Sequence, residues 1–208
     1  MIDNGPERSD VRAAFCAAAQ AFLDAVRAVR AEQWDAPGAL GVWTTRELAA
    51  HAARASFDTI ETYLVESVGP DAPLLDGAAY YRAAMATPNI HQGVADRGRT
   101  AGRGLLDPVP DVAARVERVI AVVAGAADDR VVVTPFGALR LDDYLATRAV
   151  ELCAHTVDLQ LATGQPPAVP AAAAAVAVAV LTPLADPAVL LRALLGRAPL
   201  PDGFNVLG

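Results

Sequence analysis

Residues 141–164 read LDDYLATRAVELCAHTVDLQLATG, and this stretch decides how the chain is interpreted. It predicts a helix over about 141–163 that ends at Gly164, because glycine readily takes the left-handed conformation that closes a helix. Glu151 and His155 lie four residues apart, so both side chains share one helix face, about one turn apart. A carboxylate and an imidazole in this arrangement can share a divalent metal. The alternative is an exposed hydrogen bond between them, since short motifs of this kind often occur by chance.

Three further long helices are predicted, over residues 9–31, 44–67 and 110–127. The first and the third carry apolar residues at three- and four-residue steps, which is the pattern of a helix with one buried face. The second begins at Thr44, three residues before Glu47, in the spacing of a capping box. Four long helices joined by moderate loops predict an all-α protein, a four-helix bundle.

Smaller elements fill the rest of the chain. A small β-hairpin is expected over 131–140, just before the last bundle helix. Short helices are expected at 76–86, after Pro88, at 171–182 and at 187–196, with Gly98, Gly102 and Gly104 weakening the one after Pro88. We therefore expect a helical bundle domain over 1–164, and a short helical extension over 165–208 that packs on the bundle.

Composition excludes several classes of function. Hydrophobic residues make up 54% of the 208 residues and charged residues 20%, which excludes intrinsic disorder. Acidic residues outnumber basic ones by 24 to 17, which argues against binding to nucleic acid or to an anionic membrane surface. All 17 basic residues are arginine, so Schiff-base catalysis and a lysine base are excluded.

Cellular location follows from the same sequence. The N-terminal residues contain no apolar stretch typical of a signal peptide. The uncharged window 166–185 is interrupted by prolines that leave a helix too short to cross a bilayer. The two cysteines, Cys16 and Cys153, do not suggest a secreted disulfide framework. These features predict a cytoplasmic protein, monomeric or homodimeric, whose partners are small molecules.

His51 is a candidate to complete a metal site with Glu151 and His155. It lies in the second turn of the helix predicted to begin at Thr44, and bundle proteins commonly build metal sites from inward-facing residues on different helices. Asp158 follows His155 by three residues, where it can accept the second imidazole N–H, as a carboxylate behind a ligating histidine usually does. An ordinary solvated face of ion pairs is the alternative interpretation.

Two blocks of sequence resemble a known family. Residues 40–51 read LGVWTTRELAAH, preceded by Trp34 and Pro37, and residues 148–158 read RAVELCAHTVD, preceded by TPFG at 134–137 and DYL at 143–145. Together they resemble the N-terminal domain of mycothiol-dependent maleylpyruvate isomerases, within the DinB-like metalloenzyme superfamily. The resemblance implies a DinB-like four-helix bundle with a metal held by His51, Glu151 and His155. Members with isomerase activity carry a further domain, whereas only 44 residues follow Gly164 here, as in the shorter members.

A metal site of this kind permits three functions. Three protein ligands leave a coordination position open, and zinc suits a set of two imidazoles and a carboxylate. A thiol bound there becomes a thiolate, so the resemblance implies a mycothiol-dependent S-transferase or isomerase that acts on a small electrophile. A metal-bound water would instead support hydrolysis. A metal-binding or small-molecule-binding bundle without catalysis is the third possibility.

Other polar side chains are candidates for contact with the substrate or the thiol. Arg148 precedes Glu151 by three residues and can orient it or bind an anion. His91 is a candidate acid or base, although a surface position is its default interpretation. Arg46, Arg54 and Trp43 are close in sequence to His51 and are candidates for binding the thiol or an anionic electrophile.

Overall fold

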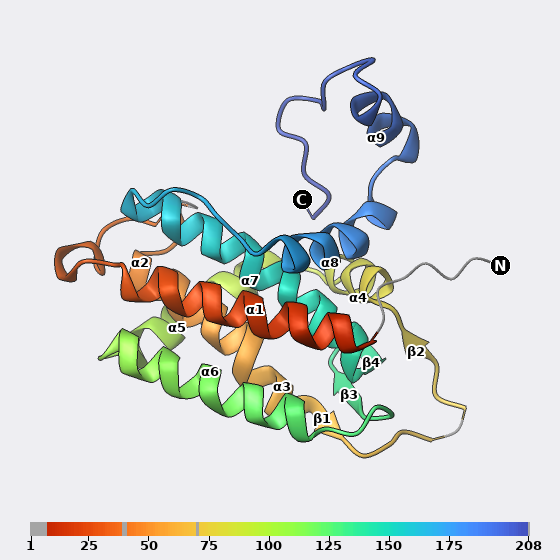
Figure 1. Cartoon of the computed structure of the whole chain (residues 1–208), viewed down its shortest axis with the longest axis horizontal. Helices are drawn as coiled ribbons and strands as arrows, with labels where there is room; N and C mark the ends of the chain where they lie inside the picture. The colour runs from red at the N-terminus through yellow and green to blue at the C-terminus, as the bar shows by residue number, and fades with distance from the viewer. Residues whose placement is uncertain (1–7, 39–40, 70, 208) are drawn as a thin grey trace.

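The computed structural model of the chain describes residues 8–38, 41–69 and 71–207, so Leu40 of the family motif lies outside the described residues. Four rods form a helical bundle (Figure 1): α1 (Arg8–Arg27), α2 (Thr45–Ala53) with its continuation, α6 (Pro108–Gly125) and α7 (Leu141–Thr163). Helix α1 packs on α6 and α7, and α2 packs on α7. The predicted all-α four-helix bundle is confirmed.

The interior of the bundle is apolar. Phe15, Phe22 and Val26 on α1 are fully buried in the same core as Leu145 and Leu152 of α7. Burial of each such side chain contributes about 1.5–3 kcal/mol. We therefore expect the fold to form without a metal ion.

The second bundle helix differs from its prediction. Thr44 caps α2, and its side chain and that of Glu47 form the expected capping box. The rod continues through a π-helical segment, η2 (Arg54–Asp58), into α3 (Thr59–Tyr63). The expected end near residue 67 was wrong, because Leu64 takes an extended conformation and pairs with Val132.

The predicted hairpin is present as β3 (Val131–Thr134) and β4 (Gly137–Arg140). Two strands of two residues each, β1 (Leu64–Val65) and β2 (Leu74–Leu75), extend it to a sheet of order β1-β3-β4-β2. Strand β2 runs parallel to β4, and the other pairs are antiparallel. Strands this short carry no periodic pattern, so the sequence did not predict them.

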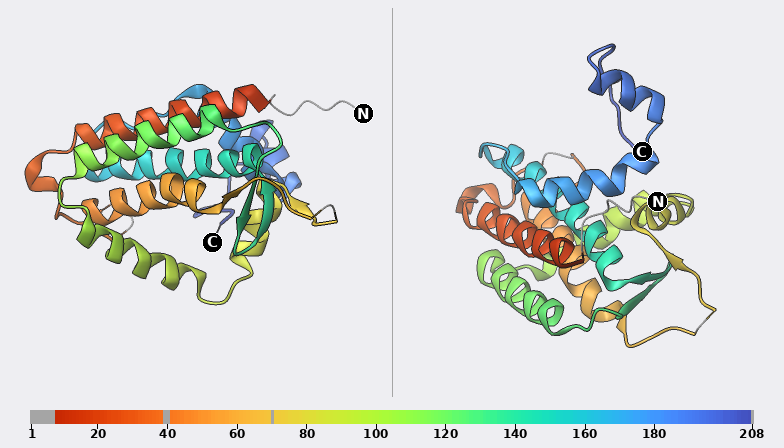
Figure 2. Two further views of the ribbon diagram at one scale, coloured as in Figure 1. Left: turned by 90° about the horizontal axis from the view of Figure 1, so that it is seen from below. Right: turned by 45° about the vertical axis from the view of Figure 1, so that its right-hand side comes forward.

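Two helices between the second and third rods complete the arrangement around the site: α4 (Gly77–Met85) and α5 (Ile90–Gly104). The short helix expected after Pro88 is present as α5, but it is longer than predicted and runs through Gly98 and Gly102. A Cβ atom at Gly98 would lie 2.6 Å from the Trp43 ring, and one at Gly102 would lie 2.6 Å from Glu47 Cγ. The glycines therefore let α5 approach α2 closely. The left view of Figure 2 shows α5 running along the side of the bundle.

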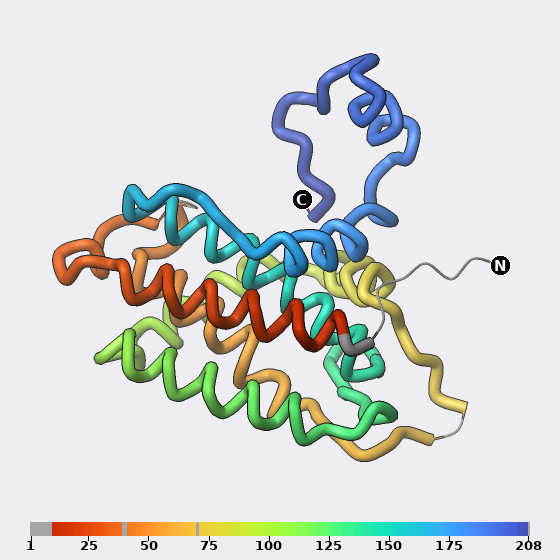
Figure 3. Tube along the Cα trace, in the orientation of Figure 1, coloured from red at the N-terminus to blue at the C-terminus, as the bar shows by residue number. Residues whose placement is uncertain are grey.

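The C-terminal segment has two parts. Helix α8 (Ala171–Leu181) packs on α1 and α7 and buries Ala173, Val176 and Ala177. Helix α9 (Pro187–Leu194) stands away from the bundle and buries none of its residues, and the chain then turns back toward α8 (Figure 3). The division into domains at residue 164 stays a prediction. Among the described residues, no helix combines the length and the apolar character needed to cross a membrane.

Candidate metal centre

Two neighbouring helices bring three side chains together. His51 comes from α2, and Glu151 and His155 come from α7. One possible ligand atom from each lies within 4.8 Å of the others, and the two imidazole centroids are 5.0 Å apart. Two nitrogen donors and one oxygen donor at this spacing fit a divalent ion such as zinc. We call these three residues the triad.

The α2 side of the triad is held by aromatic stacking. The Trp43 ring lies on the His51 ring, with centroids 4.5 Å apart and an interplanar angle of 27°. The indole N–H of Trp43 donates to the carbonyl of Ala95 on α5 at 3.0 Å, which fixes the ring. His51 makes no hydrogen bond with any described residue. Its burial, together with the charge of His155, lowers the pKa of His51 to about 3, so this imidazole is neutral.

The α7 side is held by hydrogen bonds instead. His155 Nδ1 lies 3.1 Å from Asp158 Oδ2, and its Nε2 lies 3.5 Å from Glu151 Oε2. Burial opposes protonation of this ring, but the hydrogen bonds to Asp158 and Glu151 outweigh burial and raise the pKa of His155 to about 9. With Nδ1 turned to Asp158, Nε2 is the nitrogen that faces the triad. Asp158 thus has the contact that its spacing predicted.

Glu151 is the part of the triad that remains in contact with solvent, since 22% of its side chain is exposed. Burial disfavours its charge, but the hydrogen bond with His155 and the charge of Arg148 lower the pKa of Glu151 well below its usual range. The Tyr81 hydroxyl lies 3.0 Å from Glu151 Oε1. Burial and the Glu151 charge raise the pKa of Tyr81 well above its ordinary value, so the phenol stays protonated. Sequence reasoning missed Tyr81.

Arg148 lies beneath the triad rather than in an open cavity. Its side chain is buried, and Nη1 donates to the carbonyl of Ala55, in η2, at 2.9 Å. Its Nε donates to Thr147 Oγ1 at 3.1 Å, and its guanidinium carbon is 4.7 Å from the centre of the Tyr144 ring. Arg148 therefore links α7 to the rod that carries His51. No hydrogen bond or ion pair joins Arg148 to Glu151 among the described residues, so orientation of Glu151 and anion binding both stay predictions for Arg148.

The remaining candidates are in different environments. Arg46 donates to Asp35 at 3.0 Å and to the Leu105 carbonyl at 2.9 Å, so its guanidinium has structural partners outside the triad. Arg54 is half-buried, acts electrostatically on His51, and forms no hydrogen bond or ion pair with a described residue. His91 is exposed near the start of α5 and has no polar or ring contact among the described residues.

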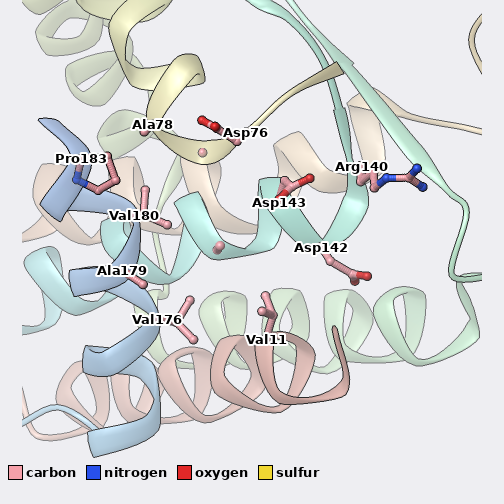
Figure 4. A pocket seen from close by; sticks show the side chains of 12 residues that line it. Val11, Asp76, Ala78, Arg140, Asp142, Asp143, Val176, Ala179, Val180 and Pro183 are labelled. Atoms are coloured by element: carbon pink, nitrogen blue, oxygen red, sulfur yellow. The ribbon is translucent and has the colours of Figure 1, made fainter. Parts of the chain in front are cut away.

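A pocket of about 480 Å³ lies elsewhere, between α1, α4, α7 and α8 (Figure 4). Val176 and Val180 of α8 form part of its apolar wall. Of its acidic side chains, Asp142 pairs with Arg12 at 2.8 Å and Asp76 caps α4. The described residues that line this pocket do not include the triad, so it is not the cavity of the candidate metal centre.

The fold is a four-helix bundle, and the His–Glu–His cluster comes from two neighbouring helices of that bundle. Residues 15–160 match the family described as the mycothiol maleylpyruvate isomerase N-terminal domain. This match covers more than half of the sequence, and the chain belongs to that family. The resemblance drawn from the two sequence blocks is confirmed.

One solved structure is similar to this chain: "Crystal structure of the mycothiol-dependent maleylpyruvate isomerase". The identity is 16%, the TM-score is 0.52, and the match covers 85% of this chain and 68% of that chain. At this identity the likeness shows the fold. No curated protein matches the sequence.

Proposed function

We propose that this protein is a divalent-metal enzyme that uses a low-molecular-weight thiol, mycothiol or a close analogue, to transfer or isomerise a small electrophile. The observation that carries the proposal is the convergence of His51, Glu151 and His155, with Asp158 behind His155. The two imidazoles and the carboxylate would hold zinc and leave a coordination position open. Zinc at such a position ionises a bound thiol.

The thiol is expected to come from outside the chain. Burial raises the pKa of Cys153 to about 11, and burial also raises the pKa of Cys16. Neither side chain supplies a thiolate near neutral pH. The similar solved protein is named as mycothiol-dependent and as an isomerase of maleylpyruvate, and we propose the same class of thiol here. We propose only that the electrophile is a small molecule. A cytoplasmic protein that is monomeric or homodimeric fits these partners.

The residues around the triad have separate tasks in this proposal. His155 gives up a proton when the ion binds, and Asp158 keeps its ring oriented. Arg148 fixes α7 against the rod that carries His51. Arg54, which is half-buried and has no described polar partner, is the cation best placed to hold a carboxylate of the thiol or of the electrophile. Trp43 holds the His51 ring in place by stacking on it.

Activity with and without a thiol tests the proposal. The zinc-loaded protein should consume a panel of small electrophiles only when mycothiol or a mimic is present. In the cobalt-substituted protein, the same thiol should add a sulfur-to-metal charge-transfer band. Thiol-independent hydrolysis, together with a cobalt spectrum that does not change when the thiol is added, would favour a metal-bound hydroxide. Metal binding without either activity would favour a non-catalytic bundle.

Substitution of Arg54 tests the anion contact separately. Arg54→Gln should raise KM for an anionic electrophile or for the thiol while metal content stays at the wild-type level. Arg46→Gln is the matched control, because Arg46 belongs to the same helical rod but is bound to Asp35 and Leu105. Equal KM values for wild type and Arg54→Gln would remove Arg54 from the binding site.

A further inference from the structure

Helix α4 lies close enough to α7 to place a side chain on the triad. Asp76 caps α4 by accepting from the backbone N–H of Ala79 at 2.7 Å. Gly77 lies against both α8 and α7, because a Cβ atom there would lie 3.1 Å from Val180 Cγ1 and 3.2 Å from Thr147 Cγ2. The absence of a side chain at Gly77 therefore lets the next turn of α4 press Tyr81 toward Glu151.

The Tyr81 hydroxyl has two acceptors within reach and one proton to donate. Glu151 Oε1 lies at 3.0 Å, and the backbone carbonyl of Thr147 lies at 3.1 Å. The carboxylate is the stronger acceptor because a hydrogen bond to an ionised group is roughly twice as strong as a neutral one. Tyr81 is only 3% exposed, so water does not compete effectively for this proton. The phenol thus binds one particular oxygen of Glu151.

The second oxygen of Glu151 is oriented toward the other ligands. Glu151 Oε2 lies 3.5 Å from His155 Nε2, the nitrogen that faces the triad. The two carboxylate oxygens therefore have different environments: Oε1 accepts from the Tyr81 phenol, and Oε2 lies toward His155.

We infer that Tyr81 is a positioning residue that reserves Glu151 Oε1, so that Glu151 offers a metal ion one oxygen rather than two. This inference rests on the proposed metal site and adds to it. A carboxylate that binds through one oxygen occupies one coordination position. A freed Oε1 would occupy the open coordination position that the proposed thiol needs, so Tyr81 would keep that position available.

The test compares cobalt loading of wild type, Tyr81→Phe and Tyr80→Phe. Tyr80 is the matched control, since it is the adjacent buried phenol and its hydroxyl contacts Arg148 Nη2 at 3.4 Å instead of Glu151. Cobalt absorbs visible light more weakly as its coordination number rises. We expect Tyr81→Phe to lose intensity because the freed Oε1 joins the ion, and Tyr80→Phe to keep the wild-type spectrum.

Two results would overturn the inference while the metal site stands: a Tyr81→Phe spectrum equal to wild type, or an equal loss of intensity in Tyr80→Phe. A wild-type protein that binds no cobalt would remove the metal site itself and this inference with it. If Tyr81→Phe does not fold, infrared difference spectra between zinc-loaded and zinc-free wild type show whether the carboxylate binds through one oxygen or two. A wide separation of the two carboxylate stretches supports binding through one oxygen, and a narrow separation contradicts it.

Discussion

The two halves of the candidate metal centre hold their histidines by different means. On the α2 side, His51 is stacked on Trp43, has no described hydrogen-bond partner, and is neutral. On the α7 side, His155 lies between Asp158 and Glu151, and its imidazole is positively charged at neutral pH. One ring is thus fixed by packing, and the other by hydrogen bonds to two carboxylates. Binding of a metal ion by the triad would therefore require the loss of one proton, from His155.

Removal of either half should abolish the site, which is the largest effect we expect. The wild-type protein should bind close to one divalent ion per chain, and His51→Ala, Glu151→Ala and His155→Ala should each lose it, since two donors hold zinc poorly compared with three. Elemental analysis after dialysis measures this. His91→Ala, which alters the exposed histidine outside the triad, should keep full occupancy. Full occupancy in all three triad variants would contradict the site.

Between pH 7 and 8, the pH dependence of the stability of the metal-free protein should come mainly from His155 in the α7 half. The pKa of His155 is raised from 6.5 to about 9, so the folded state keeps a proton that the unfolded state releases. This contribution is complete below pH 6.5 and is lost as pH rises toward 9, at up to about 1 kcal/mol per pH unit. His51 has its pKa lowered from 6.5 to about 3, so it is neutral in the folded protein and adds little slope above pH 7.

The metal-saturated protein should show a flatter stability profile than the metal-free protein between pH 7 and 8. Both imidazoles are then neutral in the folded state, and both are largely neutral in the unfolded chain. Denaturant unfolding with a chelator and with excess zinc, at several pH values, measures the two profiles. Equal slopes with and without metal would show that His155 does not exchange a proton for the ion.

Loss of Asp158 should weaken the α7 half without destroying it. Asp158→Ala removes the carboxylate behind His155 but leaves all three ligands, so metal affinity should fall about 10–100-fold. Competition with a chromogenic chelator measures the affinity. Asp96→Ala, which removes an exposed carboxylate on α5, should leave affinity unchanged. A wild-type affinity in Asp158→Ala would mean that its hydrogen bond to His155 does not prepare the ligand.

The α2 half should respond to a change in packing. A methyl group at Gly98 would lie 2.6 Å from the Trp43 ring, so Gly98→Ala should displace the ring that supports His51 and lower the free energy of unfolding by about 1–3 kcal/mol. Gly104→Ala, at the end of the same helix, meets no atom within 4 Å and should not destabilise the protein. Thermal unfolding compares the two variants, and equal destabilisation would contradict the packing argument.

Much of the fold could be predicted because its signals are local. Helix α7 has the predicted bounds, and Gly164 ends it with a φ of 73°. The capping box of Thr44 and Glu47 fixed the start of α2 in the same way. Gly98 misled us, because the sequence shows only the intrinsic cost of glycine in a helix and not the distant Trp43 ring that makes it necessary.

The residues of the site could be predicted from the sequence, but the burial of each side chain could not. Spacing puts Arg148, Glu151 and His155 on one face of a helix, yet it does not say that Arg148 is buried under Tyr144 while Glu151 reaches solvent. Nothing in the sequence of α4 marks Tyr81 as a residue of the site. Its contact with Glu151 depends on how closely α4 meets α7, and no local pattern records that distance.

The π-helical segment η2 has a consequence for how the length of this chain can change. Its Ala55 carbonyl accepts from Arg148, and the segment ends where the buried residues of α3 begin. Deleting one residue from 54–58 would let the segment become α-helical, and four α-helical residues turn the chain nearly as far as five π-helical ones, so Ile60 would still face the core. The extra residue of the π-helical turn therefore matters for the Ala55 carbonyl that accepts from Arg148, and not for the direction in which the rest of the rod faces.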